Sequence, residues 1–116
     1  KAEVAVDLIT WVPPDPMRLW QRGYDVVGEL AFAVGTALAV DAKQTLKKRF
    51  STAPQAGRSQ AQRKAALSGA FQITADVTGK KVLLVDDLAT TCTTLRRCTR
   101  LLRRAGADVI CFTLAR

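Results

Sequence analysis

The 116-residue chain contains no histidine and only three cysteines, Cys92, Cys98 and Cys111. Histidine and paired cysteines are the usual ligands of structural zinc, and no Cys-x-x-Cys pair is present, so the sequence argues against such a site. An odd, sparse cysteine count is typical of a protein from a reducing compartment and not of a disulfide-stapled scaffold. We therefore expect a cytoplasmic protein.

Long hydrophobic runs are also missing from the sequence. No apolar stretch reaches the roughly 20 residues that a bilayer-spanning helix needs. The first seven residues, KAEVAVD, place acidic residues inside the apolar pattern, which is not the pattern of a secretory signal peptide. We expect neither a membrane span nor a signal peptide.

Acidic residues are the minority among the charges. The formal net charge is +8 and the sequence pI is near 10.0, so anionic partners are plausible: nucleic acid, phosphorylated metabolites or a membrane surface. Hydrophobic residues make up 48% of the chain, which is enough for a folded core. The length suits one domain, residues 1–116, with one modest core.

Strands and helices alternate in the predicted order. Runs rich in apolar and β-branched residues predict three strands, at Val4–Val12, Val82–Val85 and Val109–Leu114. Apolar rows with helical spacing predict three helices, at Asp25–Val40, Ser59–Leu67 and Thr93–Ala105. The segments between them are a stiff Pro-rich loop, a polar edge strand or ribbon and a second loop, at Pro13–Pro16, Lys43–Phe50 and Ser51–Arg58.

This order predicts an α/β domain with a mainly parallel sheet flanked by helices. In such sheets ligands bind beyond the carboxyl ends of the strands, which makes Pro13–Arg22 and Asp86–Thr94 the candidate binding segments. Gly35 is expected to allow close packing of the first long helix, Gly79 to form a turn, and Gly106 to end the last helix. Cys98 and Cys111 are expected on core faces.

The stretch VLLVDDLATTCTT, Val82–Thr94, carries the chemistry. A buried strand delivers Asp86 and Asp87 to the sheet edge, and a short loop then enters the N-terminus of a helix, where free N–H groups and the helix dipole favour an anion. Threonine hydroxyls add further donors. Two carboxylates beside an anion site suit a ligand that is both a phosphate and a polyol or magnesium complex.

Taken singly, these residues have simpler interpretations. Thr90 could cap the helix, and the aspartates could solvate the end of a strand. A P-loop is excluded because nothing in the chain matches G-x-x-x-x-G-K-[ST]. The complete strand–loop–helix pattern favours the functional interpretation.

VLLVDDLATTCTT resembles the phosphoribosyl-pyrophosphate (PRPP) signature of type I phosphoribosyltransferases, an apolar strand leading to two acids and a Thr-Thr-Gly-x-Thr-like loop. Two further segments resemble the competence protein F (ComF) family within that group. They are WVPPDPMRLWQRGYD, Trp11–Asp25, and TAPQAGRSQAQRKAALSGAF, Thr52–Phe71. The ending DVICFTLAR also fits, and the resemblance is collinear over nearly the whole chain.

The resemblance implies a PRPP-binding, phosphoribosyltransferase-like fold that works with Mg²⁺. Asp86 and Asp87 would face the ribose hydroxyls and the magnesium-bound diphosphate and act as the catalytic pair. The 5′-phosphate would be cradled by Thr90, Thr91, Cys92, Thr93 and Thr94. The pyrophosphate would be bordered by Pro13, Arg18 and Arg22. A mobile segment over the site would include Thr52, Gln55 and Arg63.

The sequence also departs from the family pattern. Cys92 stands at the glycine position of the phosphate loop, where glycine permits unusual dihedral angles or close approach to phosphate. Arg58 and Ala66 replace the family's leucine and asparagine. The paired-cysteine, zinc-ribbon-like N-terminal segment that ComF proteins often carry, and a hood that selects the acceptor base, are expected to be absent.

These departures leave a second function open. A catalytically decayed domain could act as a nucleic-acid-associated or protein-interaction module in competence-type DNA uptake. The last helix carries Arg96, Arg97, Arg100, Arg103 and Arg104, which is either a solvated face or a surface for single-stranded nucleic acid. Aromatics for base stacking are missing beside it, which favours the solvated face. A third alternative is a homodimer formed through the exposed edge of a small sheet.

Overall fold

The computed structural model describes residues 5–49, 69–87 and 92–114. In these ranges the chain forms β1 (Leu8–Trp11), α1 (Pro16–Arg22), α2 (Val26–Leu38), β2 (Leu46–Lys48), β3 (Phe71–Ile73), β4 (Lys81–Asp87), α4 (Cys92–Arg104) and β5 (Asp108–Leu114). The predicted loop and helix over residues 51–67 lie outside the described residues.

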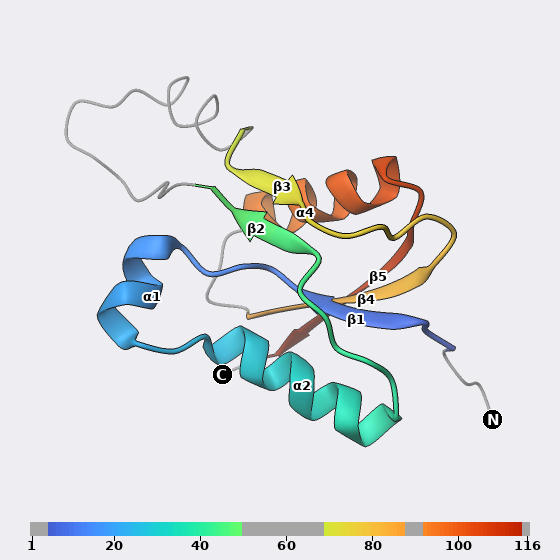
Figure 1. The fold of residues 1–116 in the computed structure, drawn as a ribbon, viewed down its shortest axis with the longest axis horizontal. Helices are drawn as coiled ribbons and strands as arrows, with labels where there is room; N and C mark the ends of the chain where they lie inside the picture. Colours follow the sequence, from blue (N-terminus) through green and yellow to red (C-terminus); the bar gives the residue numbers. More distant parts are fainter. Residues whose placement is uncertain (1–4, 50–68, 88–91, 115–116) are drawn as a thin grey trace.

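The main sheet is parallel and has the strand order β1-β4-β5. The strands β2 and β3 form a separate antiparallel pair, so the polar segment predicted as an edge strand or ribbon is indeed a strand of a ribbon. Figure 1 shows α2 on one side of the main sheet, and α4 with the β2–β3 pair on the other. The predicted α/β fold with a mainly parallel sheet flanked by helices is confirmed.

Alternation along the central strand β4 builds two cores on opposite faces of the sheet. Val82 and Leu84 pack with α4, β2 and β3, where Leu46 and Leu102 are fully buried. Leu83 and Val85 pack with β1 and α2. Burying each of these large side chains contributes about 1.5–3 kcal/mol relative to leaving it exposed, so β4 anchors both layers.

The first long helix follows the sequence prediction closely. Asp25 caps α2 by accepting a hydrogen bond from the Gly28 N–H, 2.9 Å away. A Cβ atom added at Gly35 would stand 2.7 Å from the Val40 carbonyl oxygen, so glycine permits the close packing expected there. No helix in the described ranges combines the length and apolar character that a bilayer span requires.

Most of the candidate segment Pro13–Arg22 is the helix α1, which begins at the last residue of the loop predicted at Pro13–Pro16. Asp15 accepts a hydrogen bond from the Met17 N–H, Pro16 occupies the first helical turn, and Gly23 ends α1 with φ 81°. Proline is pre-organised for a first helical turn, because its φ is already helical and its missing N–H is not needed there. Asp15 followed by Pro16 was therefore a helix-start signal.

The two cysteine predictions have different outcomes. Cys98 is fully buried between α4 and the sheet, as expected for a small hydrophobe. Cys111 lies on the α4 side of β5, 3.4 Å from the Thr99 hydroxyl, but it is exposed there and is not the buried small hydrophobe that was expected. Among the described strands β5 pairs only with β4, so it lies at the margin of the sheet where α4 covers it incompletely. Gly79 and Gly106 have φ of 73° and 96°, and Gly106 follows α4 as predicted.

Candidate functional site

The carboxyl ends of the three parallel strands meet at one edge of the main sheet. Trp11 at the end of β1 is in register with Val85, and the Val12 N–H donates a 3.0 Å hydrogen bond to the Val85 carbonyl. The next residues of β4 are Asp86 and Asp87, which pair with the end of β5. The chain that follows β1 therefore starts beside the end of β4, at the edge where the sequence places the candidate binding segments.

Both aspartates belong to the strand itself and are buried, with 1% of Asp86 and 8% of Asp87 exposed. Strand alternation places Asp86 in the row of Val82 and Leu84, on the α4 face. Asp87 continues the row of Leu83 and Val85, on the α2 face. The two carboxylates thus flank the end of β4 from opposite sides, which is an arrangement that sequence adjacency alone does not reveal.

The negative charge of Asp86 affects the buried Cys98 thiol of α4. Burial, and then the Asp86 carboxylate, raise the pKa of the Cys98 thiol to about 12, and the Lys48 ammonium opposes this rise. Cys98 therefore stays a neutral thiol at physiological pH. Leu46 of β2 and Phe71 of β3 pack in the same core as Cys98, so the β2–β3 pair covers the face of the sheet that carries Asp86.

Lys48 ties the β2–β3 pair to the segment that follows β1. Its ammonium group lies 3.2 Å from Oδ2 of Asp15, and the exposed fractions of the two side chains are only 9% and 11%. The amine also lies 5.5 Å from the ring centroid of Phe71. Sequence reasoning missed this pair, because Lys48 sits in a basic cluster that resembles a solvated surface.

Trp11 and Asp25 form a hydrogen bond on the α2 side of this sheet edge. The Trp11 indole N–H donates to Oδ2 of Asp25 at 2.9 Å, while Oδ1 of Asp25 caps α2. A Cβ atom added at Gly28 would stand 2.7 Å from Oδ2 of Asp25, so glycine leaves room for this carboxylate. These contacts hold α2 against the end of β1, beside Asp87.

Behind the edge, a hydroxyl pair links β1 to the chain that leads into β2. The Thr45 hydroxyl donates to the Thr10 hydroxyl at 2.7 Å, and both residues are fully buried. The Thr45 N–H also donates to the same Thr10 oxygen, at 3.3 Å. This polar contact inside the core holds the chain that leads into β2 against β1.

The structure describes the side chains of two of the three residues predicted to border the pyrophosphate. Pro13 is buried two residues after the end of β1, and Arg22 lies exposed in the last turn of α1. Arg18 belongs to α1, but its side chain is not among those described. The segment after β1 therefore presents a helix beside the acidic edge, with Asp15 and Lys48 bracing its start.

The predicted phosphate loop is described only at its end. Thr90 and Thr91 lie outside the described residues, and Cys92 and Thr93 open α4 without described side chains. Thr94 is half-buried in the first turn. The first N–H groups of a helix lack partners within it, and α4 has no acidic residue in its first turn, so this end attracts an anion. Thr52, Gln55 and Arg63 lie outside the described residues.

Comparison with known proteins gives both a family and similar folds. A model of the phosphoribosyl transferase domain matches residues 21–116. The structure of the allosteric regulatory enzyme of purine biosynthesis is similar to 97% of this chain, with a TM-score of 0.64 and 27% identity. Glutamine PRPP amidotransferase from B. subtilis, complexed with ADP and GMP, is similar over the same share, with a TM-score of 0.61 and 25% identity.

This chain covers only 22% and 23% of those two proteins. A search of curated proteins gives no match. The similarity therefore concerns a domain-sized part of larger chains.

Proposed function

Because this chain belongs to the phosphoribosyl transferase domain family, we propose that it binds PRPP at the carboxyl edge of its parallel sheet. The observation that carries the proposal is the junction of β4 and α4. Two buried carboxylates end the strand, and the N-terminus of a 13-residue helix follows within a few residues. A ligand with ribose hydroxyls and phosphates matches both halves of this junction.

Each part of PRPP then has a partner in the proposal. Asp86 and Asp87 accept hydrogen bonds from the ribose hydroxyls, and the 5′-phosphate lies at the first turn of α4, where Thr94 adds a hydroxyl. The diphosphate lies toward the segment after β1, with Arg18 and Arg22 as counter-charges. The ion pair of Lys48 and Asp15 has a positioning role, because it holds the start of α1 in place.

Mg²⁺ fits this donor set as a partner of the ligand. Among the described residues no three acidic or cysteine side chains cluster around one point as a complete cage for a metal ion would require. Mg²⁺ commonly keeps several waters and binds through one or two carboxylates plus substrate phosphates. Asp86 and Asp87 would hold the hydrated ion, which would neutralise charge on the diphosphate.

Phosphoribosyl transfer to an acceptor is the reaction that this arrangement would serve. Displacement of pyrophosphate leaves positive charge on the sugar ring, beside the carboxylates, and negative charge on the leaving group, beside the cations. The protein's contribution is to position these groups and to stabilise the charges. No proton-transferring histidine is required.

Cys92 bears on whether this reaction proceeds. α4 begins at Cys92, so its backbone is helical, a conformation that any residue adopts without strain. In the proposal, the cost of replacing glycine is thus the added side-chain volume and not an unusual φ. Cys92→Gly is accordingly expected to tighten PRPP binding.

The proposal that the chain is a member of the ComF family is supported by the resemblance of the collinear segments Trp11–Asp25 and Thr52–Phe71. The alternative function, a nucleic-acid-associated or protein-interaction module of DNA uptake, is supported by the arginines of α4. A chain with that function alone would bind single-stranded DNA but not PRPP, in either the native or the Cys92→Gly form. The homodimer formed through the exposed edge of a small sheet stays a prediction.

A matched pair of variants tests the proposed site. We expect Asp87→Asn to weaken PRPP binding in the presence of Mg²⁺ by roughly 10- to 100-fold, the loss of one or two charge-assisted contacts. Asp76→Asn, at an exposed turn, is the control and should bind PRPP as the native protein does. Circular dichroism checks that both variants are folded. Equal binding by Asp87→Asn and the native protein would contradict the placement.

A further inference from the structure

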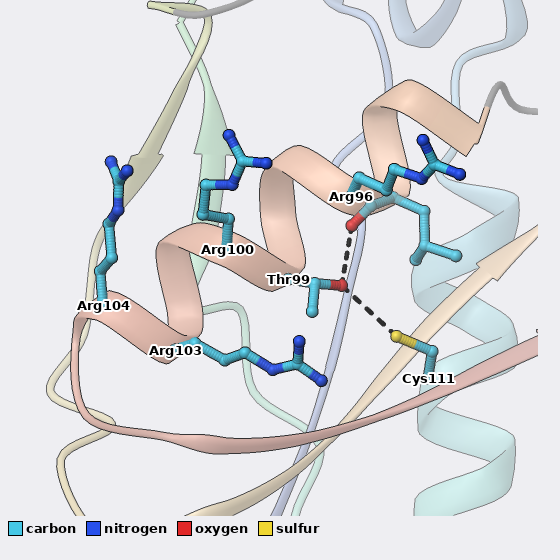
Figure 2. A pocket seen from close by; sticks show the side chains of 7 residues that line it. Arg96, Thr99, Arg100, Arg103, Arg104 and Cys111 are labelled. Atoms are coloured by element: carbon cyan, nitrogen blue, oxygen red, sulfur yellow. Dashed lines mark hydrogen bonds between the residues drawn. The ribbon is translucent and has the colours of Figure 1, made fainter.

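A second basic feature lies along the flank of α4, away from the acidic edge of the sheet. A cavity of about 590 Å³ opens between α4 and β5. It is lined by Leu95, Arg96, Thr99, Arg100, Arg103, Arg104 and Cys111. Figure 2 shows the arginines distributed around it, with Arg103 extending beneath Thr99 toward Cys111. The Asp86 and Asp87 carboxylates are not among the lining groups.

The floor of this cavity satisfies its own hydrogen bonds. The Thr99 hydroxyl donates to the Leu95 carbonyl at 2.8 Å, and its oxygen lies 3.4 Å from Sγ of Cys111. The single hydroxyl proton is used toward Leu95, so the Cys111 thiol is the donor in the second contact. Thr99 and Cys111 therefore use their donor hydrogens within the protein, which leaves the arginines as the polar groups available to a ligand.

Helix energetics does not account for all of these arginines. Cations near a helix C-terminus interact favourably with its dipole, which explains Arg103 and Arg104 in the last turn. Arg96 lies in the N-terminal half, where the dipole disfavours a cation, and Arg96 and Arg100 repel each other at i, i+4 spacing. The helix contains no acidic residue. Across the described residues, none of the four forms an ion pair with a carboxylate.

We propose that this groove binds a condensed phosphate, either inorganic polyphosphate or the triphosphate group of a nucleotide. Arginine guanidinium groups match phosphate oxygens with paired hydrogen bonds, and several adjacent phosphates can neutralise four neighbouring cations. From Arg96 to Arg104 the helix rises about 12 Å, a span that suits a short phosphate chain. The cavity volume is within the range typical of small-molecule sites.

A single-stranded nucleic acid fits the groove less well. Proteins that bind such strands without sequence preference usually combine a basic groove with aromatic side chains on which the bases stack. None of the residues that line this groove is aromatic. The groove therefore suits recognition of phosphates without stacked bases.

Calorimetry with tripolyphosphate and with ATP at low ionic strength tests the groove. We expect one groove-bound ligand per chain. Each arginine removed should lower the affinity roughly tenfold, so the double variant Arg100→Gln/Arg103→Gln should bind about a hundredfold more weakly. Lys43→Gln/Lys80→Gln removes the same charge from exposed positions outside the groove. This control should stay within about twofold of the native affinity. Equal affinity for both ligands identifies the phosphate chain as the recognised group, and tighter ATP binding identifies a nucleotide.

Backbone amide NMR shifts locate the ligand independently of affinity. Shifts centred on residues 99–104 and 111 support the groove, whereas shifts confined to the end of β4 and the start of α4 overturn it. Equal weakening by the lysine control, or unchanged affinity in the arginine variant, overturns it too. So does a single-stranded oligonucleotide that binds more tightly than tripolyphosphate and loses affinity in the arginine variant, because the groove would then be a nucleic-acid surface.

Discussion

The Lys48 ammonium group and the Asp15 carboxylate form a nearly buried ion pair, 3.2 Å apart, between two segments 33 residues apart in the sequence. The pair joins β2 to the N-cap of α1, beside the edge of the sheet where β4 ends in two aspartates. Since Asp15 also caps α1, one carboxylate positions both the helix after β1 and the β2–β3 pair. The proposed PRPP site thus has a brace that neither segment could supply alone.

Removing the lysine tests this brace. Lys48→Met keeps the length of the apolar stem but removes the cation from the Asp15 carboxylate, so we expect a loss of about 1–3 kcal/mol in the free energy of unfolding. Lys47→Met, at the exposed neighbouring position of β2, should change it by less than about 0.5 kcal/mol. Urea denaturation measures both. Equal small effects would show that the ion pair is solvated and has no bracing role.

The packing of α2 depends on Gly35. An alanine Cβ at this position would stand 2.7 Å from the Val40 carbonyl oxygen, a backbone atom that cannot move independently. We expect Gly35→Ala to destabilise the protein by about 1–3 kcal/mol, despite the better helix propensity of alanine. Gly69→Ala, where an added Cβ meets nothing within 4 Å, is the control. A Gly35→Ala protein as stable as the native one would contradict the close approach of Val40 to the end of α2.

Cys98 predicts a pH dependence of stability. Its pKa is raised to about 12 in the folded protein, first by burial and then by Asp86, from an ordinary value near 8.5 in an unfolded chain. A group with a raised folded pKa contributes stability that is complete below the unfolded pKa and is lost as pH rises toward the folded one. The free energy of unfolding should therefore fall above about pH 8.5, by up to ~1.4 kcal/mol per pH unit.

The Cys98→Ala variant isolates this contribution, because the remaining groups titrate equally in both proteins. The difference in unfolding free energy between native protein and variant should shrink as pH rises from 8.5 toward 12. A difference that is independent of pH would mean that the thiol ionises equally easily in both states. Consistent with the same burial, Cys98 should react with a thiol reagent at pH 8 only after denaturation.

The parts of the fold that local pattern could specify were predicted from the sequence. The continuous apolar run of β4 is buried on both faces, and the stripe through Cys98 and Leu102 packs α4 on the sheet. β4 is longer than its apolar run, since Asp86 and Asp87 continue the pairing with β5. The two aspartates face opposite sides of the sheet because both belong to the strand. The apolar run alone predicts a strand that ends at Val85, which is too early.

Features that depend on distant pairing escaped prediction. Lys48 looks the same in sequence as its exposed neighbour Lys47, and only the approach of β2 to the segment after β1 buries it. Cys111 lies on the α4 side of β5, but periodicity identifies a face and not whether a helix covers it. The predicted roles of Thr90, Thr91, Thr52, Gln55 and Arg63 remain predictions, because these residues lie outside the described ranges.

Titration of the native chain and of Cys92→Gly with PRPP, with and without Mg²⁺, tests the central claim most directly. We predict saturable binding of one PRPP at the end of β4, strengthened by Mg²⁺, and tighter in Cys92→Gly because the smaller residue leaves more room for the phosphate. Binding by Cys92→Gly alone would place the obstruction at that side chain. Failure of both proteins to bind PRPP saturably would contradict the account.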